Sequence, residues 1–237
     1  MGAEELLAKL AATTHLPQVQ LKIDSSDPSD SKTMRLLSRY EQTGDKIELD
    51  LMGRLLSGNP HPSRFLIEQR IDLAAPSYKI NMWAVVPPDP NKVIPFPFVP
   101  WDDMPSTELK NFDLVLPFPF DATLLDPAPA PQPGSPGDPP PATCKVVELA
   151  LKTPTHDVGS DRMRLWIEDL GPAAVDHRVE HYRGATLLRV VFGPPTQRTT
   201  VNVQNGRKTV TTVTASNANH PIPHDQFMWV NLTSNTW

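Results

Sequence analysis

The sequence of 237 residues is short of the features that many functional classes need. It has one cysteine, Cys144, so no internal disulfide can form. Its 22 basic residues are outnumbered by 27 acidic ones, and no basic run stands out, which argues against a protein that grips nucleic acid by its phosphates. No apolar stretch approaches the roughly 20 residues that span a membrane. We therefore expect neither a disulfide scaffold nor a membrane span, and no nucleic-acid partner.

Targeting signals are also lacking at the amino-terminal end. The stretch "MGAEELLAKLAATTHLP" has no basic start followed by an apolar core, as a secretory signal has. Leu6 stands where a myristoylated chain carries Ser or Thr. The expectation is synthesis in a reducing, intracellular compartment.

Catalytic signatures are scarce as well. The stretch "VFGPPTQ" follows an apolar run, but its two prolines remove the N–H groups that a phosphate-binding loop needs. Cys144 begins another apolar run with no histidine beside it, which is typical of a packed thiol and not of a nucleophile. We expect no cofactor and no enzymatic activity.

Proline, by contrast, is abundant. Of 28 prolines, 17 lie between Pro87 and Pro141, where fixed φ angles and missing N–H donors exclude long helices. Residues 126–142 also lack large apolar side chains, so we expect this segment to be an exposed, extended and mobile loop.

Pro-Phe-Pro-Phe occurs twice, within Val93–Asp103 and within Leu114–Asp126. Residues two apart share a face of an extended chain, so each stretch presents two rings to one side. Its prolines suit an edge strand or a strand entrance, not a central strand. Two alternatives stay open, because the rings can close the core of this chain or contact a neighbouring copy. The four rings belong to Phe96, Phe98, Phe118 and Phe120.

Hydrophobic periodicity predicts a few short helices and many strands. Helices are expected at 3–13, 31–44 and 172–184, because acidic first turns, capping residues or terminal glycines mark their ends. Residues 44–58 are compatible with a strand or a helix. Apolar alternation or short apolar runs predict strands at 18–24, 63–73, 77–86, 144–151, 162–170 and 185–193.

The clearest local signal is a hairpin in "RTTVNVQNGRKTVTTV". Asn205-Gly206 is the favoured pair for a two-residue type I′ turn, which matches the twist of its flanking strands. The threonine-rich strands are too polar for a core. We therefore expect the hairpin to project into solvent or to lie against another subunit.

One short motif suggests a metal. His177–His181 reads HRVEH, which fits the H-x-x-E-H pattern of the inverted zinc peptidases. On the predicted helix the two histidines would share a face, with Glu180 beside them. Those families take a third ligand from a downstream glutamate, but the only acid after Glu180 is Asp225. We therefore expect no metal; if one binds, the candidate ligands are His177, His181, His220 and His224.

Together these signals predict a mainly β chain, either a β-sandwich or a jelly-roll-like barrel with two or three short helices. The alternative fold class is α+β. A single β-rich domain is expected over residues 1–237, with an amino-terminal helical segment over about 1–44 and the mobile loop at 126–142.

Short strands, proline-blunted edges, the proline-rich loop and many Thr and Asn resemble the coat and accessory capsid proteins of non-enveloped viruses and phages. The resemblance implies a structural protein, above all a decorating surface protein, that assembles with its own copies and with a main capsid shell protein. It implies a location in the virion after assembly in the host cytoplasm, and otherwise in the cytoplasm. The interface candidates are Phe96, Phe98, Trp101, Phe118, Phe120, Asn205, Gly206, Phe227, Trp229 and Trp237.

Two alternative functions are left open. One is a metal-dependent hydrolase that uses the HRVEH segment. The other is a monomeric β module that binds a ligand through its loops.

Overall fold

A computed structural model describes residues 2–14, 17–58, 64–72, 77–85, 89, 91–96, 120–151, 160–217 and 222–233. The chain divides into two compact units, which are described separately. Unit 1 comprises Met1–His15 and Pro100–Thr211, and unit 2 comprises Leu16–Val99 and Thr212–Trp237. None of the helices in the described ranges is long and apolar enough to cross a lipid bilayer.

The prediction of a mainly β chain is confirmed. Within the described ranges, thirteen strands follow one another in a single hydrogen-bonded order, β6-β5-β4-β3-β2-β1-β13-β12-β11-β10-β9-β8-β7, in place of the two sheets of a sandwich. Nearly every neighbour in this order is also a neighbour in sequence, so the sheet is a run of antiparallel hairpins. Strand β13 is shared by the two units.

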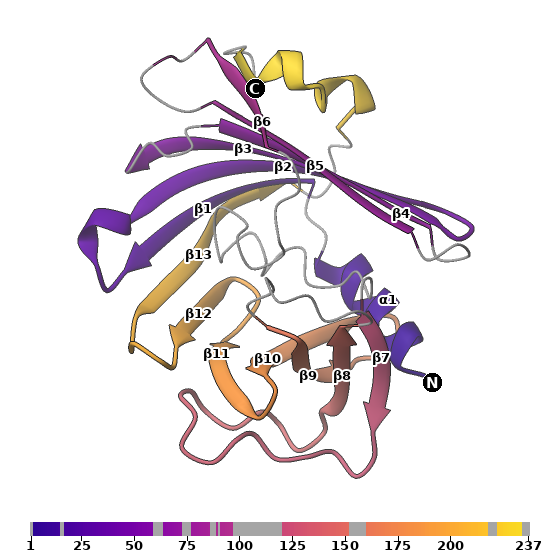
Figure 1. Ribbon diagram of the computed structural model, residues 1–237. Helices are drawn as coiled ribbons and strands as arrows, with labels where there is room; N and C mark the ends of the chain where they lie inside the picture. The colour runs from indigo at the N-terminus through magenta and orange to yellow at the C-terminus, as the bar shows by residue number, and fades with distance from the viewer. Residues whose placement is uncertain are drawn as a thin grey trace. The chain divides into compact units, whose positions relative to one another are not determined.

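Unit 1 contains helix α1 and the strands from β7 to the start of β13 (Figure 1). Its elements are α1 (Ala3–Thr14), β7 (Phe120–Leu125), β8 (Lys145–Leu151), β9 (Arg162–Asp169), β10 (Ala174–Arg183), β11 (Thr186–Phe192), β12 (Gln197–Asn202) and the first residues of β13 (Lys208–Asn217).

Helix α1 covers one face of the unit 1 sheet, which we call the helix face. Leu6, Leu7 and Leu10 are buried there against apolar side chains of β8 to β11, because their spacing places them on one side of the helix. The backbone N–H of Ala174 donates to Thr13 Oγ1 at 3.2 Å. The strand residues of this core are Val147, Leu149, Met163, Leu165, Ile167, Ala174, Val179 and Val191. The helix predicted at 3–13 is thus confirmed.

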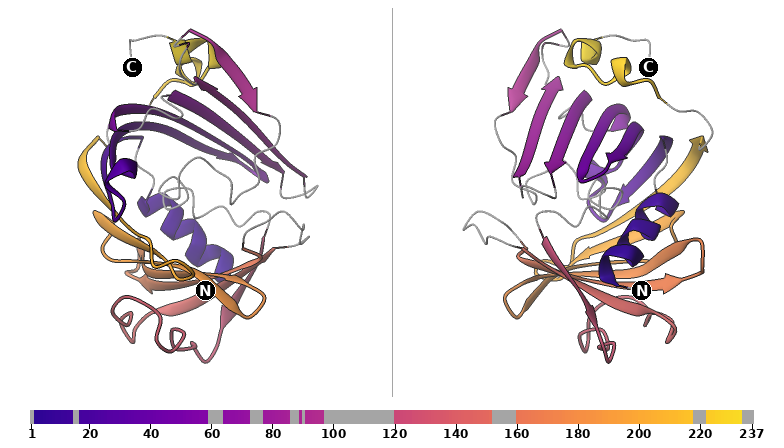
Figure 2. Two further views of the ribbon diagram at one scale, coloured as in Figure 1. Left: turned by 60° about the vertical axis from the view of Figure 1, so that its left-hand side comes forward. Right: turned by 90° about the vertical axis from the view of Figure 1, so that its right-hand side faces the viewer.

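Among the residues that the structure describes, unit 2 contains the remaining strands and three short 3₁₀ turns (Figure 2). Its elements are β1 (Gln18–Ser25), η1 (Pro28–Asp30), β2 (Lys32–Thr43), β3 (Lys46–Gly58), β4 (Arg64–Asp72), β5 (Ser77–Val85), β6 (Val93–Phe96), the end of β13, η3 (His224–Gln226) and η4 (Trp229–Thr233).

Two helix predictions are wrong. Residues 32–43 form strand β2, in which Leu36 and Leu37 are buried on opposite faces of the sheet. Apolar residues buried on both faces give a spacing that resembles that of a helix, which is why the prediction failed. Residues 174–183 form strand β10, with Val179 buried on the helix face and Tyr182 on the other. Gly184, the predicted end of that helix, has a positive φ of 56° in the turn between β10 and β11. The undecided stretch 44–58 contains strand β3.

The predicted hairpin exists, but its turn differs from the predicted two residues. Strands β12 and β13 are joined by Val203–Arg207, and the N–H of Asn202 donates to the Arg207 carbonyl at 2.9 Å. The side chain of Asn202 accepts hydrogen bonds from Gln204 N (3.0 Å) and Asn205 N (3.3 Å), which favours the longer turn.

The first Pro-Phe-Pro-Phe stretch contributes to edge strand β6, where Pro95 lies opposite Trp83. The second contributes Phe120, the first residue of β7, at the other end of the strand order. The predicted edge position is therefore confirmed for the described part of each stretch, since proline costs least where no ladder hydrogen bond is needed.

Gly53 on β3 lies very close to the ring of Phe65 on β4. A Cβ at Gly53 would lie 2.0 Å from Cζ of Phe65, which stands directly opposite on β4. Gly53→Ala is therefore expected to lower the free energy of unfolding by about 1–3 kcal/mol through overpacking. Urea denaturation measures this change.

The control is a double-variant cycle with Phe65→Leu, which frees space beside residue 53. If steric conflict is the cause, Gly53→Ala costs less in the Phe65→Leu background than alone. Equal costs in both backgrounds contradict the assignment.

Candidate functional site

The most extensive candidate surface lies on one side of the unit 2 sheet, which we call the apolar face. Register places Val19, Leu36, Gly53 and Phe65 in one row across β1 to β4, since each stands opposite the next. The next row holds Leu51 and Ile67, with Ser38 as its polar member. Residues with buried side chains on this face are Val19, Leu21, Ile23, Met34, Leu36, Leu49, Leu51, Phe65, Ile67 and Ala84.

The opposite side of the same sheet, which we call the charged face, holds a network of ion pairs. Asp50 is fully buried and contacts Arg39 Nε at 2.9 Å and Arg70 Nη1 at 2.6 Å. Arg39 also pairs with Glu48 at 2.8 Å, and this hydrogen bond holds the pKa of Glu48 below its usual range. The carboxylates here are therefore matched by arginines on neighbouring strands.

The carboxy-terminal segment packs on the charged face. Phe227 and Leu232 are buried against Leu37, Met52 and Leu66. Arg64 Nη1 donates to the Leu232 carbonyl at 2.9 Å. Figure 2 shows the turns of this segment beside the strands of unit 2. The apolar and charged faces are thus chemically distinct, and this segment belongs to the charged one.

The HRVEH segment lies on strand β10, where a β-bulge places its two histidines on opposite faces of the sheet. The register of β10 against β9 shifts between Asp176 and Arg178. His177 Nε2 donates to Glu168 Oε2 at 2.9 Å, whereas His181 stands opposite Met163 on the helix face. Residues 163 and 168 point to opposite faces of β9, so the two histidines do as well.

His177 and His181, two of the four candidate metal ligands, are therefore not brought together. No group of three or more His, Cys, Asp or Glu side chains within the described ranges could hold a metal ion. His224 is exposed in unit 2, and His220 lies outside the described residues. The geometry that the hydrolase alternative requires of His177 and His181 is absent, because a strand with a bulge replaces the predicted helix.

His181 lines a polar hollow of about 210 Å³ in unit 1. Arg189 Nη2 lies 3.4 Å from His181 Nδ1; since arginine only donates, this contact favours the tautomer with its proton on Nε2. The other lining residues are Ser160, Arg183, Leu188, Asn202 and Gln204. The sequence analysis identified His181 but not the hollow, because most of the other lining residues come from three further segments, at residue 160, in β11 and at 202–204.

The proline-rich segment 126–142 is held on the side of the unit 1 sheet opposite the helix face. Arg178 Nη1 donates to the Pro136 carbonyl at 2.8 Å, and its Nη2 donates to Ser135 Oγ at 2.5 Å. Trp166 Nε1 donates to the Pro129 carbonyl at 3.2 Å. These contacts anchor the segment at several points; the predicted mobility stays a prediction.

Arg178 itself belongs to a buried charged cluster. Its Nε donates to Glu180 Oε1 at 2.8 Å, and neither side chain is more than 1% exposed. Tyr182 donates its hydroxyl to the other oxygen of Glu180, and burial together with this hydrogen bond raises the pKa of Tyr182. The cluster stabilises the position of the loop, since Arg178 bonds to the loop and to Glu180 at once.

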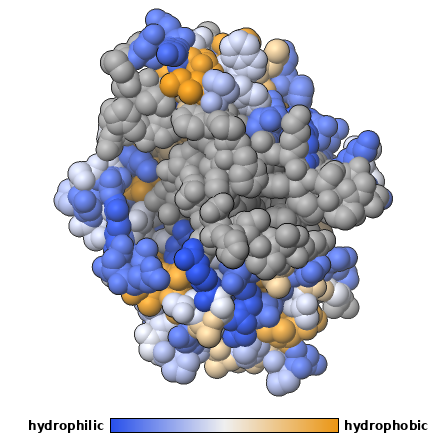
Figure 3. Space-filling model, in the orientation of Figure 1, coloured by the Kyte–Doolittle hydropathy of each residue, from blue (hydrophilic) through white to orange (hydrophobic). Residues whose placement is uncertain are grey.

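The interface candidates have different fates. Phe227 is buried within unit 2, whereas Asn205 and Gly206 are exposed in the hairpin turn. Trp229 is half exposed, as are its neighbours Met228 and Val230. Figure 3 shows apolar surface at the top of the view, where Figure 1 draws β6 and the carboxy-terminal segment. The interface role of these residues stays a prediction.

The side chains of the remaining interface candidates lie outside the described part of the structure. The backbone of Phe96 lies in β6 and that of Phe120 in β7, but their rings are outside what the structure describes. Phe98, Trp101, Phe118 and Trp237 lie outside the described residues.

The fold is similar to that of solved bacterial proteins. The chain matches a putative outer membrane lipoprotein-sorting protein domain from Vibrio parahaemolyticus at a TM-score of 0.63 and 15% identity, over 98% of this chain and 96% of that one. It matches a LolA superfamily protein from Nitrosomonas europaea at 0.61 and 13%, over 96% and 98%. A DUF1329 family protein from Desulfovibrio piger matches at 0.65 and 12%, over 95% of each chain.

No family model matches the chain, and no curated protein sequence matches it. The likeness is therefore one of fold.

The resemblance to capsid proteins is wrong, because the matched fold is that of bacterial proteins, one of them titled a lipoprotein-sorting domain. The predicted decorating role, assembly with its own copies and with a capsid shell protein, and location in the virion or cytoplasm are wrong for the same reason. The texture of short strands, prolines and threonines is shared by unrelated β proteins.

The Arg178–Glu180 pair yields a stability prediction. Arg178→Met leaves Glu180 buried without its cation and is expected to lower the free energy of unfolding by about 3–5 kcal/mol. Amide hydrogen exchange should also become faster in residues 126–142, since two arginine bonds to that loop are lost. Urea denaturation and exchange mass spectrometry measure the two effects.

Arg183→Met is the matched control, because Arg183 is an exposed arginine on the same strand. We expect it to change stability by no more than about 0.5 kcal/mol. Similar losses in both variants would refute a special role for the buried pair.

Cys144 yields a second prediction. Burial raises the pKa of its thiol to about 11, and it packs against Val146 and Trp166. Because only the thiolate reacts, alkylation by iodoacetamide at pH 8 should be roughly a hundredfold slower than for an exposed thiol. Unfolding in guanidinium should abolish the difference; rapid alkylation of the native protein would contradict it.

Proposed function

We propose that the chain is a non-enzymatic carrier that binds the acyl chains of a lipid-anchored protein on the apolar face of unit 2. The observation that carries the proposal is the continuity of that face across β1 to β4, with Ser38 as the polar interruption of its central rows. A sheet face of this kind gains free energy from any apolar cover, at roughly 25 cal/mol per Å² of area removed from water.

The similar folds support this assignment. One is titled a lipoprotein-sorting domain of the outer membrane and another a LolA superfamily protein. On this proposal the chain acts in the cell envelope, and its ligand is a lipoprotein. The alternative of a monomeric ligand-binding β module is therefore preferred, with the ligand on a sheet face instead of on loops.

The burial of the apolar face sets a condition on binding. Leu51, Phe65 and Ile67 are no more than 2% exposed, so acyl chains must replace the groups that now cover them. Binding is then an exchange of one apolar cover for another, and no bond of the ligand has to be made or broken.

A reconstitution experiment tests the proposal. Triacylated lipoprotein in detergent is mixed with the protein, the detergent is removed, and soluble complex is measured by size-exclusion chromatography. We expect the wild-type protein to keep the lipoprotein soluble in a 1:1 complex. The same lipoprotein without acyl chains should not bind.

Two variants of strand β2 locate the site. Ser38→Glu adds a charge to the apolar face and is expected to weaken binding at least about tenfold, because the carboxylate must lose water when acyl chains cover it. Thr33→Glu makes the same kind of change on the charged face and should leave binding unchanged. Absence of a wild-type complex, or equal effects of the two variants, would overturn the proposal.

A further inference from the structure

The charged face of unit 2 carries three arginines in one row. Arg35 on β2 stands opposite Arg54 on β3, which in turn stands opposite Arg64 on β4. Like charges placed directly opposite each other on a sheet are destabilising. The charge of Arg54 contributes, after burial, to a lowered pKa of Arg64. A bound anion would offset the repulsion among these three arginines.

Arg35 lacks such an anion in the part of the chain that the structure describes. No residue in the described ranges forms a hydrogen bond or ion pair with its side chain, whereas Arg64 donates to the Leu232 carbonyl. The acids of the same face are engaged elsewhere, since Glu48 and Asp50 pair with Arg39. Those acids do not neutralise Arg35.

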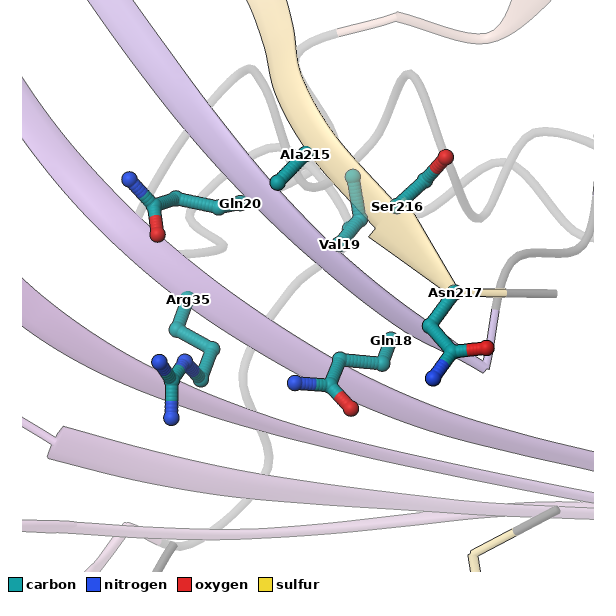
Figure 4. A pocket seen from close by; sticks show the side chains of 7 residues that line it. All are labelled: Gln18, Val19, Gln20, Arg35, Ala215, Ser216 and Asn217. Atoms are coloured by element: carbon teal, nitrogen blue, oxygen red, sulfur yellow. The ribbon is translucent and has the colours of Figure 1, made fainter. Parts of the chain in front are cut away.

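A hollow of about 130 Å³ opens beside Arg35, at the pairing of β1 with the end of β13. Figure 4 shows the side chains of Gln18, Gln20, Arg35 and Asn217 extending to the same side of these strands, while Val19 and Ser216 extend to the other. The small side chain of Ala215 leaves the space open. The hollow therefore combines one guanidinium with three amides that can donate hydrogen bonds.

The size of the hollow limits the ligand. Its volume equals that of about four water molecules, at roughly 30 Å³ each in the liquid. That space takes one tetrahedral oxyanion, while the rest of a larger molecule stays outside. Arginine suits such a group because its planar fork bonds two phosphate oxygens at once.

We infer that this hollow binds a phosphate group, with Arg35 as its cation and the amides of Gln18, Gln20 and Asn217 as additional donors. Arg54 adds long-range attraction from the neighbouring strand. The phosphate is carried by a lipid headgroup or by a small soluble molecule. The site lies on the face opposite the proposed acyl-binding surface and does not depend on it.

Titration calorimetry at low ionic strength tests the inference with inorganic phosphate and with glycerol 3-phosphate. Arg35→Gln is expected to weaken binding at least about tenfold, because a charged hydrogen-bond donor is lost. Lys22→Gln is the matched control, because it changes the net charge by the same amount as Arg35→Gln. Lys22 lies on the neighbouring strand β1 and pairs with Asp24 at 2.9 Å. It should change affinity less than about twofold.

Flotation with vesicles separates the two sources of phosphate. Vesicles of phosphatidylglycerol that bind the wild type but not Arg35→Gln support a lipid headgroup, with phosphatidylcholine vesicles as the reference. Binding of glycerol 3-phosphate without vesicle binding supports a soluble phosphate ester. No binding in any arm, or equal losses in Arg35→Gln and Lys22→Gln, overturns the inference.

Thermal unfolding adds a readout that a purely structural role would not give. Without ligand, Arg35→Gln should unfold at the same or a higher temperature than the wild type, because a like-charge contact is removed. A lower unfolding temperature would mean that Arg35 stabilises the fold directly and would contradict the site. Ser38→Glu should leave phosphate binding intact, so the two proposals can fail separately.

Discussion

Strand pairing in this chain forces successive side chains onto opposite faces of a sheet, so each unit has to satisfy two chemically different surfaces at once. In unit 1 the two surfaces are covered by helix α1 and by the proline-rich segment 126–142. In unit 2 one surface is apolar and the other carries ion pairs and the carboxy-terminal segment. The position of every candidate site follows from this division.

The buried charges of Arg178 and Glu180 are held by several partners at once. Glu180 accepts from Arg178 and Tyr182, and Arg178 in turn donates to a carbonyl of the proline-rich segment. Proline suits such a segment because it keeps its carbonyl while losing its N–H, so an extended run offers acceptors without adding donors that need burial. The prolines of this segment thus supply carbonyl acceptors to buried donors, a role that the amino-acid composition did not reveal.

Much of the fold was predictable from sequence, and the failures have identifiable physical causes. Alternation located β1, β4, β5, β8, β9 and β11 because each carries apolar residues at a period of two or in a short run. It failed at 32–43, where burial on both faces imitates a helix, and at 174–183, where the glycine interpreted as the end of a helix belongs to a turn between two strands. The bulge at His177 also separates two histidines that a helix would have placed on one face. The apolar face was missed because no local pattern tells which strands pair or in what register.

The burial of the apolar face bears on what kind of binding protein this can be. A carrier has to release its ligand as well as hold it, and an uncovered apolar face would bind acyl chains too tightly and would aggregate when empty. When the face is already covered, the ligand gains only the difference between its own contacts and those it displaces. Affinity is then set by the competition between two covers, so a modest change in either one, such as contact with a membrane or a receiving protein, is enough to reverse the exchange.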